Sequence, residues 1–254
     1  MKRIKTLAFG TFKEGVRSKQ FLSVAVFAVL MLLSALVMSE MSFAERKKIV
    51  EDVGLSFMTL FGLLVTLYVG MELIYKEIDR RTIYIILSKP VSRRSFIVGK
   101  YFGLLLLIFT HLLLMIVTLS LLFFFYVGSF EIHLFKAVYM IFLELSIIAA
   151  ITVFFSSFTT PAVAAFSALS FYIIGYSTSI INAYLAKQAG IFKLLMGIVF
   201  GIFPKLGYLD IKMEVVHKLP IQGSRFLYGT LYSVAYILVV IVLSILVFDR
   251  REFK

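Results

Sequence analysis

The chain has 254 residues, of which 61% are hydrophobic and 16% are charged, and its mean hydropathy is +1.01. This composition excludes a soluble globular domain and indicates an integral membrane protein. The net charge of +12 does not indicate a nucleic-acid partner, because the basic residues flank apolar runs. The absence of cysteine excludes disulfides, thiol catalysis and thiolate metal ligands.

Residues 1–20 carry six Lys and Arg residues ahead of the first apolar run. Placed on a helix, this segment has apolar residues on one half and charged residues on the other. The pattern predicts an amphipathic helix that lies in the membrane interface and leads into the first span, the alternative being a merely basic tail. The following apolar run of about 19 residues is longer than the core of a plain signal peptide.

Six windows are long and apolar enough to cross a bilayer as helices: residues 21–39, 55–75, 101–127, 138–158, 162–183 and 227–248. A seventh apolar run, 191–203, is too short to cross, contains Gly197 and Gly201, and is followed by Pro204. We therefore expect a re-entrant or interfacial segment there, within an external segment 184–226. The predicted fold is a single all-α transmembrane domain of six spans.

The distribution of Lys and Arg predicts the orientation of the chain. With six spans, one face holds 6 basic residues in the N-terminal segment, 7 in the loop 76–100 and 3 in the C-terminal tail. The three segments on the opposite face hold 3, 1 and 6 basic residues, and the 6 belong to the long segment 184–226. By the positive-inside rule, both termini and the loop 76–100 face the cytoplasm, in the cell (inner) membrane.

Three ionisable side chains lie inside the predicted spans, where such groups are costly and are candidate functional residues. Glu72 stands four residues before Lys76, a spacing that favours a helical ion pair. Glu144 has no partner near it in sequence, so it must bond another helix, face water or carry a proton. His111 is isolated, which favours a packed, hydrogen-bonded histidine over a ligand.

No motif of enzyme chemistry is present. The three histidines, His111, His133 and His217, are scattered, and none forms a paired motif beside an acid. The sequence also has no Gly-x4-Gly-Lys-Ser/Thr loop that could hold phosphate. No catalytic or metal site is predicted, and any energy from ATP must come from a partner.

Residues 76–100 form a charged insert between the second and third spans. Pro90 predicts that a helix beginning near Lys76 ends near Ser88, and Ser92 is suited to cap a second helix that runs into the third span. An element attached at both ends to spans converts a push from outside into helix motion. The alternative is an ordinary solvated loop. The first helix offers a partner these charged and apolar side chains: Asp79, Arg80, Arg81, Ile83, Ile86 and Leu87.

At these residues the chain resembles a permease subunit of type 2 ABC transporters, especially the six-span branch related to copper-site maturation, gliding and bacteriocin immunity. The matching residues are Glu77, Asp79, Arg80, Arg81, Thr82, Lys89, Pro90, Val91, Ser92, Arg93, Gly99 and Lys100. Other stretches that resemble the family are FKEGVRSK, SSFTTPAVAAFSAL, IFPKLGYLDI and FDRREF. Many relatives have Gly where Arg81 stands.

The resemblance implies two permease chains, a homodimer, around a central pathway in membrane lipid. It also implies a cytoplasmic ATPase that binds ATP and magnesium and grips the coupling helix, with no cofactor in this chain. The implied coupling residues are Glu77, Asp79, Arg80, Arg81, Thr82, Ile83, Ile86, Leu87, Lys89 and Pro90. The second and fifth spans would line the pathway with an aromatic wall, which is suited to lipid-like or amphiphilic cargo. The candidate pathway residues are Phe57, Phe61, Tyr68, Glu72, Phe166, Phe171, Tyr172 and Tyr176.

The leading hypothesis is therefore the membrane subunit of an ATP-driven exporter. A second hypothesis is a secondary transporter or channel that uses Glu72 and Glu144, although inverted repeats are not evident. A third is a component that transmits force from an ATPase to an external partner, with 184–226 as its working surface.

Overall fold

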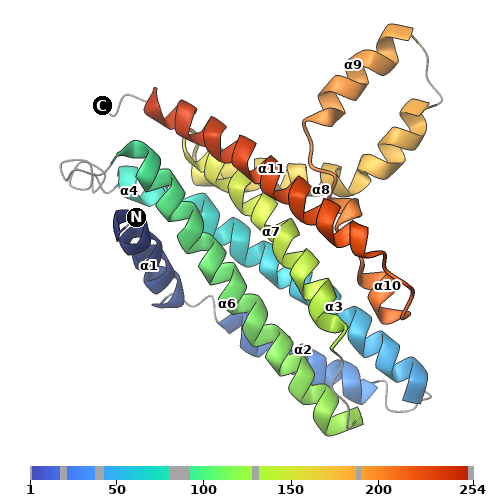
Figure 1. The fold of residues 1–254 in the computed structure, drawn as a ribbon. Coiled ribbons are helices and arrows are strands. Elements are labelled where there is room, and N and C mark those ends of the chain that lie inside the picture. The colour runs from blue at the N-terminus through green and yellow to red at the C-terminus, as the bar shows by residue number, and fades with distance from the viewer. Residues whose placement is uncertain are drawn as a thin grey trace.

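The computed structural model describes residues 2–17, 22–37, 43–79, 92–127, 132–186 and 190–250, and all regular elements in these ranges are helices. Within these described ranges, five helices are long and apolar enough to cross a membrane. The expected all-α membrane fold is thus confirmed (Figure 1). The elements are α1 Lys2–Arg17, α2 Leu22–Val37, α3 Phe43–Glu72, α4 Tyr75–Asp79, α6 Arg93–Val127, α7 Leu134–Ser156, α8 Pro161–Ala186, α9 Gly190–Gly201, η3 Leu206–Tyr208, α10 Lys212–Val216 and α11 Gly223–Asp249.

The first predicted span, 21–39, corresponds to α2, whose 16 residues make it shorter than the five candidate spans. The residues that flank α2 on both sides, 18–21 and 38–42, lie outside the described ranges. The count of six spans therefore stays a prediction. Helix α9, in the region expected to be re-entrant, has 12 residues and is too short to cross.

Helix α3 begins at Phe43, although residues 40–54 were expected to lie outside the second span. Its early turns pack against neighbouring helices. The Glu51 side chain is 1% exposed and lies 3.7 Å from the His133 imidazole, which precedes α7. Gly54 also lies so close to α6 that a Cβ there would be 2.9 Å from Leu119. These contacts extend the helix beyond its most apolar part.

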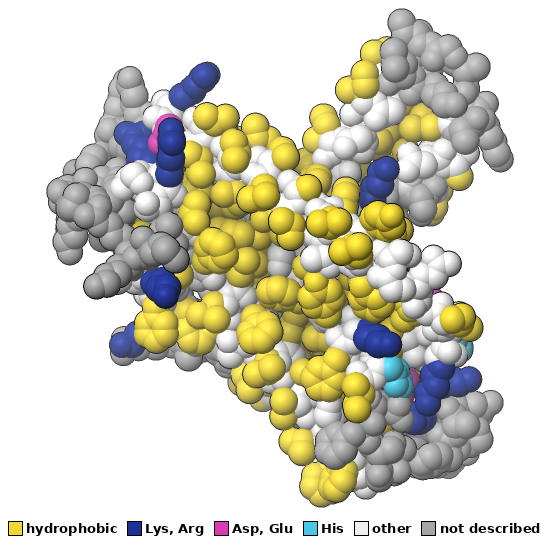
Figure 2. Space-filling view, in the orientation of Figure 1, with side chains coloured by type: hydrophobic (Ala, Val, Ile, Leu, Met, Phe, Trp, Pro, Cys, Tyr) yellow, Lys and Arg dark blue, Asp and Glu magenta, His cyan; other side chains and the backbone are white. Residues whose placement is uncertain are grey.

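Helix α7 is the centre of the bundle. It contacts α3, α6, α8 and α11, and most of its residues are buried. In the space-filling view a band of hydrophobic side chains covers the middle of the molecule, with Lys and Arg at both ends (Figure 2). This distribution is typical of a bundle whose outer surface faces lipid.

The segment of residues 204–216, here called the return segment, folds back onto the bundle. It contains η3 and α10 and contacts α3, α7 and α8. Five apolar side chains of this segment are at most 3% exposed: those of Leu206, Leu209, Ile211, Val215 and Val216. Helix α9 and the end of α8 instead form an arm that projects from the side of the bundle (Figure 1).

Helix α1, expected in the membrane interface, packs closely on α6. A Cβ at Gly103 of α6 would lie 2.5 Å from the Thr11 Cβ and 2.7 Å from the Ala8 carbonyl oxygen of α1. Because one of these atoms belongs to the backbone, α1 itself would have to move to make room. Only glycine at position 103 permits this contact.

Replacing Gly103 with leucine is expected to push α1 away from α6 and to lower the free energy of unfolding by about 1–3 kcal/mol, the usual cost of overpacking. The thermal unfolding midpoint of the purified protein in detergent measures this effect. Gly10→Leu is the matched control, because a Cβ at Gly10 meets no atom within 4 Å. Equal midpoints for the two variants would refute the close contact.

Candidate functional site

The loop between the second and third predicted spans begins at α4, and an ion pair joins this point to α6. Nζ of Lys100 in α6 donates to Oε1 of Glu77 in α4 over 2.9 Å. The Lys100 ammonium also lies 5.8 Å from the centre of the Phe96 ring. Lys100 is only 5% exposed, so Glu77 is the counter-charge of a buried cation. This ion pair links α4 directly to α6.

A second ion pair lies one turn earlier. Glu72, at the end of α3, pairs with Lys76 in α4, as their spacing predicts, and this prediction is confirmed. Between them the chain turns at Leu73 and Ile74, both of which are buried. The second predicted span is thus not one continuous helix into the loop, but two helices held across a turn.

The other end of the loop is attached to the last helix of the chain. The Arg93 guanidinium donates to the carbonyl oxygens of Phe248 and Asp249, over 3.1 and 2.9 Å. The Phe96 and Phe248 rings stack 5.7 Å apart. These bonds satisfy carbonyl groups at the C-terminus of α11, where a cation is also favoured by the helix dipole.

Ser92 caps α6, which confirms the predicted role of this residue. Its hydroxyl oxygen accepts a hydrogen bond from the backbone N–H of Ser95 over 3.2 Å. This bond satisfies one of the free donors in the first turn of a helix. Helix α6 therefore begins at Arg93, directly after its cap.

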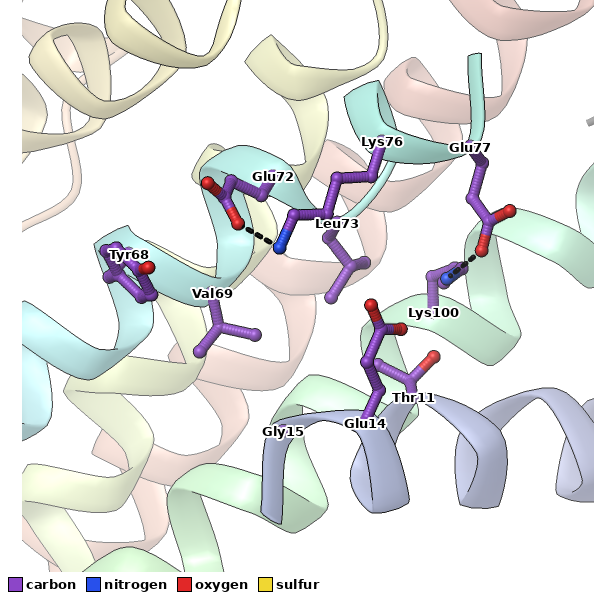
Figure 3. A pocket seen from close by; sticks show the side chains of 10 residues that line it. All are labelled: Thr11, Glu14, Gly15, Tyr68, Val69, Glu72, Leu73, Lys76, Glu77 and Lys100. Atoms are coloured by element: carbon purple, nitrogen blue, oxygen red, sulfur yellow. Dashed lines mark hydrogen bonds and ion pairs between the residues drawn. The ribbon is translucent and has the colours of Figure 1, made fainter. Parts of the chain in front are cut away.

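A small cavity of about 80 Å³ lies beside the two ion pairs. The side chains of Thr11 and Glu14 reach toward it from α1 (Figure 3). The Thr11 hydroxyl is buried and makes no hydrogen bond with any described residue. The cavity lies between α1, α3, α4 and α6. Its lining residues are Thr11, Glu14, Gly15, Tyr68, Val69, Glu72, Leu73, Lys76, Glu77 and Lys100.

Of the predicted coupling residues, Glu77 and Asp79 are described, and Asp79 is exposed. The backbone of the others lies outside the described residues, so their expected role stays a prediction. These are Arg80, Arg81, Thr82, Ile83, Ile86, Leu87, Lys89 and Pro90.

The predicted pathway residues lie on α3 and α8, and their role as the lining of a pathway stays a prediction. Phe57 and Phe61 contact each other on α3, with ring centres 6.2 Å apart, and Phe171 packs against Phe203 at 4.6 Å. Tyr68 and Phe166 are 52% and 73% exposed. Glu72 belongs to the loop junction, and His111 is buried with Nε2 3.5 Å from the Ser23 hydroxyl, as expected of a packed histidine.

A second polar cluster surrounds Glu144, which is 1% exposed in α7. Tyr172 and Tyr176 face it from α8, with their ring centres 5.0 Å apart. The charges of Lys212 and Asp210 in the return segment also act on this carboxylate. The structure thus brings together Glu144, Tyr172 and Tyr176.

Sequence reasoning did not find Lys212, since no local pattern links it to Glu144. Among the described residues, no group of three or more Asp, Glu and His side chains is placed to hold a metal ion.

A family model described as ABC-2 family transporter protein matches residues 7–253, nearly the whole chain. The chain belongs to the ABC-2 transporter family. The resemblance to a type 2 ABC transporter permease is therefore confirmed, whereas the six-span branch within that family stays a prediction. This ABC-2 protein is a multi-pass membrane component of an ABC transporter. No curated protein matches the chain. Membership of the family implies a separate cytoplasmic ABC ATPase as partner.

Proposed function

We propose that this ABC-2 protein is the permease subunit of an ATP-driven exporter, and that the partner ATPase acts on it through residues 76–100. The observation that carries the proposal is the attachment of this loop at both ends. Glu77 pairs with the buried Lys100, and Arg93 bonds the end of α11. A push on the loop would therefore reach three membrane helices, α3, α6 and α11, at once.

In the proposed mechanism, the ATPase binds ATP and magnesium and closes on the loop at the exposed Asp79. The turn at Leu73–Ile74 lets α4 move relative to α3, while the Glu77–Lys100 pair transmits this movement to α6. The cavity next to Thr11 accommodates the shift. A second copy of this permease would complete the pathway, with both termini in the cytoplasm.

The coupling role is tested by reversing the charge of the loop with Arg80→Glu and Arg81→Glu. We expect at least a tenfold loss of the P-loop ATPase that co-purifies with the tagged permease, measured by ATP hydrolysis and by identifying the ATPase. The matched control reverses another arginine pair of the same predicted face, Arg250→Glu with Arg251→Glu, and should retain the ATPase. An unchanged amount of ATPase in the loop variant would overturn the proposal.

A gradient-driven transporter is the second candidate, and the buried Glu144 favours it. In that case, flux would survive depletion of ATP and would be lost in Glu144→Gln. If transport is ATP-driven, flux should instead be lost when ATP is depleted.

A further inference from the structure

Glu144 lies near the middle of the bundle with part of its hydrogen-bonding capacity unused. It stands ten residues after the start of α7, which at 1.5 Å per residue is about 15 Å along the helix. Neither Glu144 Oε1 nor the Tyr176 hydroxyl makes a hydrogen bond with good geometry to any described residue, and both atoms are buried. Buried polar atoms are nearly always partnered, so these two indicate a place for a ligand.

Lys212 shows which chemistry fits this place. Its Nζ lies 5.9 Å from the centre of the Tyr176 ring, 3.5 Å from the Thr59 hydroxyl and 3.6 Å from Oδ1 of Asp210. A primary ammonium is thus already present beside the tyrosine ring. A cation is attracted by the face of an aromatic ring and by a nearby carboxylate. Because Lys212 belongs to the return segment, movement of that segment would withdraw it.

An apolar groove of about 510 Å³ lies between α7, α8, the end of α9 and α11, and two of its lining residues are near the cluster in sequence. Ile151 in the groove is seven residues, or two turns, after Glu144, on the same face of α7 and about 10 Å further along. On α8, Phe171 in the groove directly precedes Tyr172. The groove is lined by, among others, Ile151, Phe155, Phe171, Tyr236, Val240 and Leu243.

We propose that Glu144, Tyr172 and Tyr176 bind the amino group of a cationic amphiphile whose apolar tail lies in this groove. The carboxylate supplies the counter-charge and the two rings supply cation–π contacts, while the tail is buried against aliphatic and aromatic side chains. The Lys212 ammonium already lies beside the Tyr176 ring, and in the proposal it competes with the amine for that ring. The identification of this amphiphile as cargo rests on the proposed transport function, whereas its binding does not.

The test uses octylammonium as the probe and octanol as its uncharged counterpart. Isothermal titration calorimetry of the permease in lipid nanodiscs, corrected with empty nanodiscs, measures both affinities without any ATPase present. We expect Glu144→Gln to weaken octylammonium binding at least tenfold and Lys212→Gln to strengthen it several-fold. Octanol binding should change little in either variant. Opposite effects from two residues of opposite charge distinguish a shared site from general damage to the fold.

Glu51→Gln is the matched control, because Glu51 is also 1% exposed but lies beside His133, outside the site. It should leave octylammonium affinity unchanged. If Glu144→Gln does not fold, Tyr176→Leu replaces it and should also weaken binding. Unchanged affinity in Glu144→Gln or Tyr176→Leu, or weaker binding in Lys212→Gln, would overturn the site. Suppose that octylammonium binding changes as expected, but the loop variant still co-purifies with an unchanged amount of ATPase. The binding site would then stand, and only the ATP-driven function would be refuted.

Discussion

Glu77→Gln is expected to destabilise the protein more than Lys100→Met, although both substitutions break the same ion pair. The Lys100 side chain is 6% exposed, so the loss of Glu77 leaves a buried cation without its counter-charge. Such a loss costs about 3–5 kcal/mol. The Glu77 side chain is 21% exposed, and water can solvate its carboxylate once Lys100 is replaced. The Lys100→Met variant should therefore lose only about 1 kcal/mol, close to the value of a surface pair.

The thermal unfolding midpoints of the two variants and of the Glu77→Gln/Lys100→Met double variant measure this asymmetry. The double variant should regain most of the stability lost by Glu77→Gln, because no charge then remains buried. Its transport should nevertheless stay impaired, since the link between α4 and α6 is gone. Equal destabilisation by the two single substitutions would show that the ammonium is not held as the structure places it.

Arg225→Met is expected to release the return segment from the bundle. The Arg225 guanidinium donates to Oε1 of Glu214 over 2.5 Å and to the carbonyl oxygens of Asp210 and Tyr208 over 2.9 and 3.3 Å. The loss of these charge-assisted bonds costs about 2–3 kcal/mol. That change corresponds to an open population that is roughly 30- to 150-fold larger. Arg225→Lys should release the segment partly, because a lysine cannot reproduce the fork of donors.

Cysteine labelling measures this release cleanly, since the chain has no cysteine of its own. A cysteine introduced by Leu209→Cys replaces a side chain that is 1% exposed, and its labelling by a maleimide should become much faster in Arg225→Met. Leu219→Cys, at a position that is 53% exposed, is the control and should react at the same rate in both backgrounds. An unchanged rate at position 209 would mean that other contacts hold the segment.

The features that could be predicted from the sequence depend on residues close together in the chain. The Glu72–Lys76 pair follows from the i,i+4 spacing, and the Ser92 cap follows from a hydroxyl residue ahead of an apolar run. The long apolar helices follow from hydropathy and from the need to satisfy backbone groups in lipid. The family resemblance in the loop also came from a short, contiguous set of residues.

The features that were missed depend on how helices rotate and approach one another. Lys100 was noted as part of a motif, but its bond to Glu77 across the loop was not predicted. The start of α3 was expected outside the span because it contains charged residues. In the structure these turns are helical, and α3 packs on α6 and α7. A helix that is apolar on all sides does not reveal in its sequence which face meets which neighbour.

The amino-acid sequence by itself determined that this is an all-helical membrane protein with a charged loop. It also showed no enzyme motif. These properties depend on local composition and on the cost of exposing polar groups to lipid. Only the tertiary structure decided that the loop is bonded to α6 and α11, and that Lys212 lies beside the ring of Tyr176, which faces Glu144. Contacts between distant segments depend on helix packing and register, which local sequence patterns do not encode.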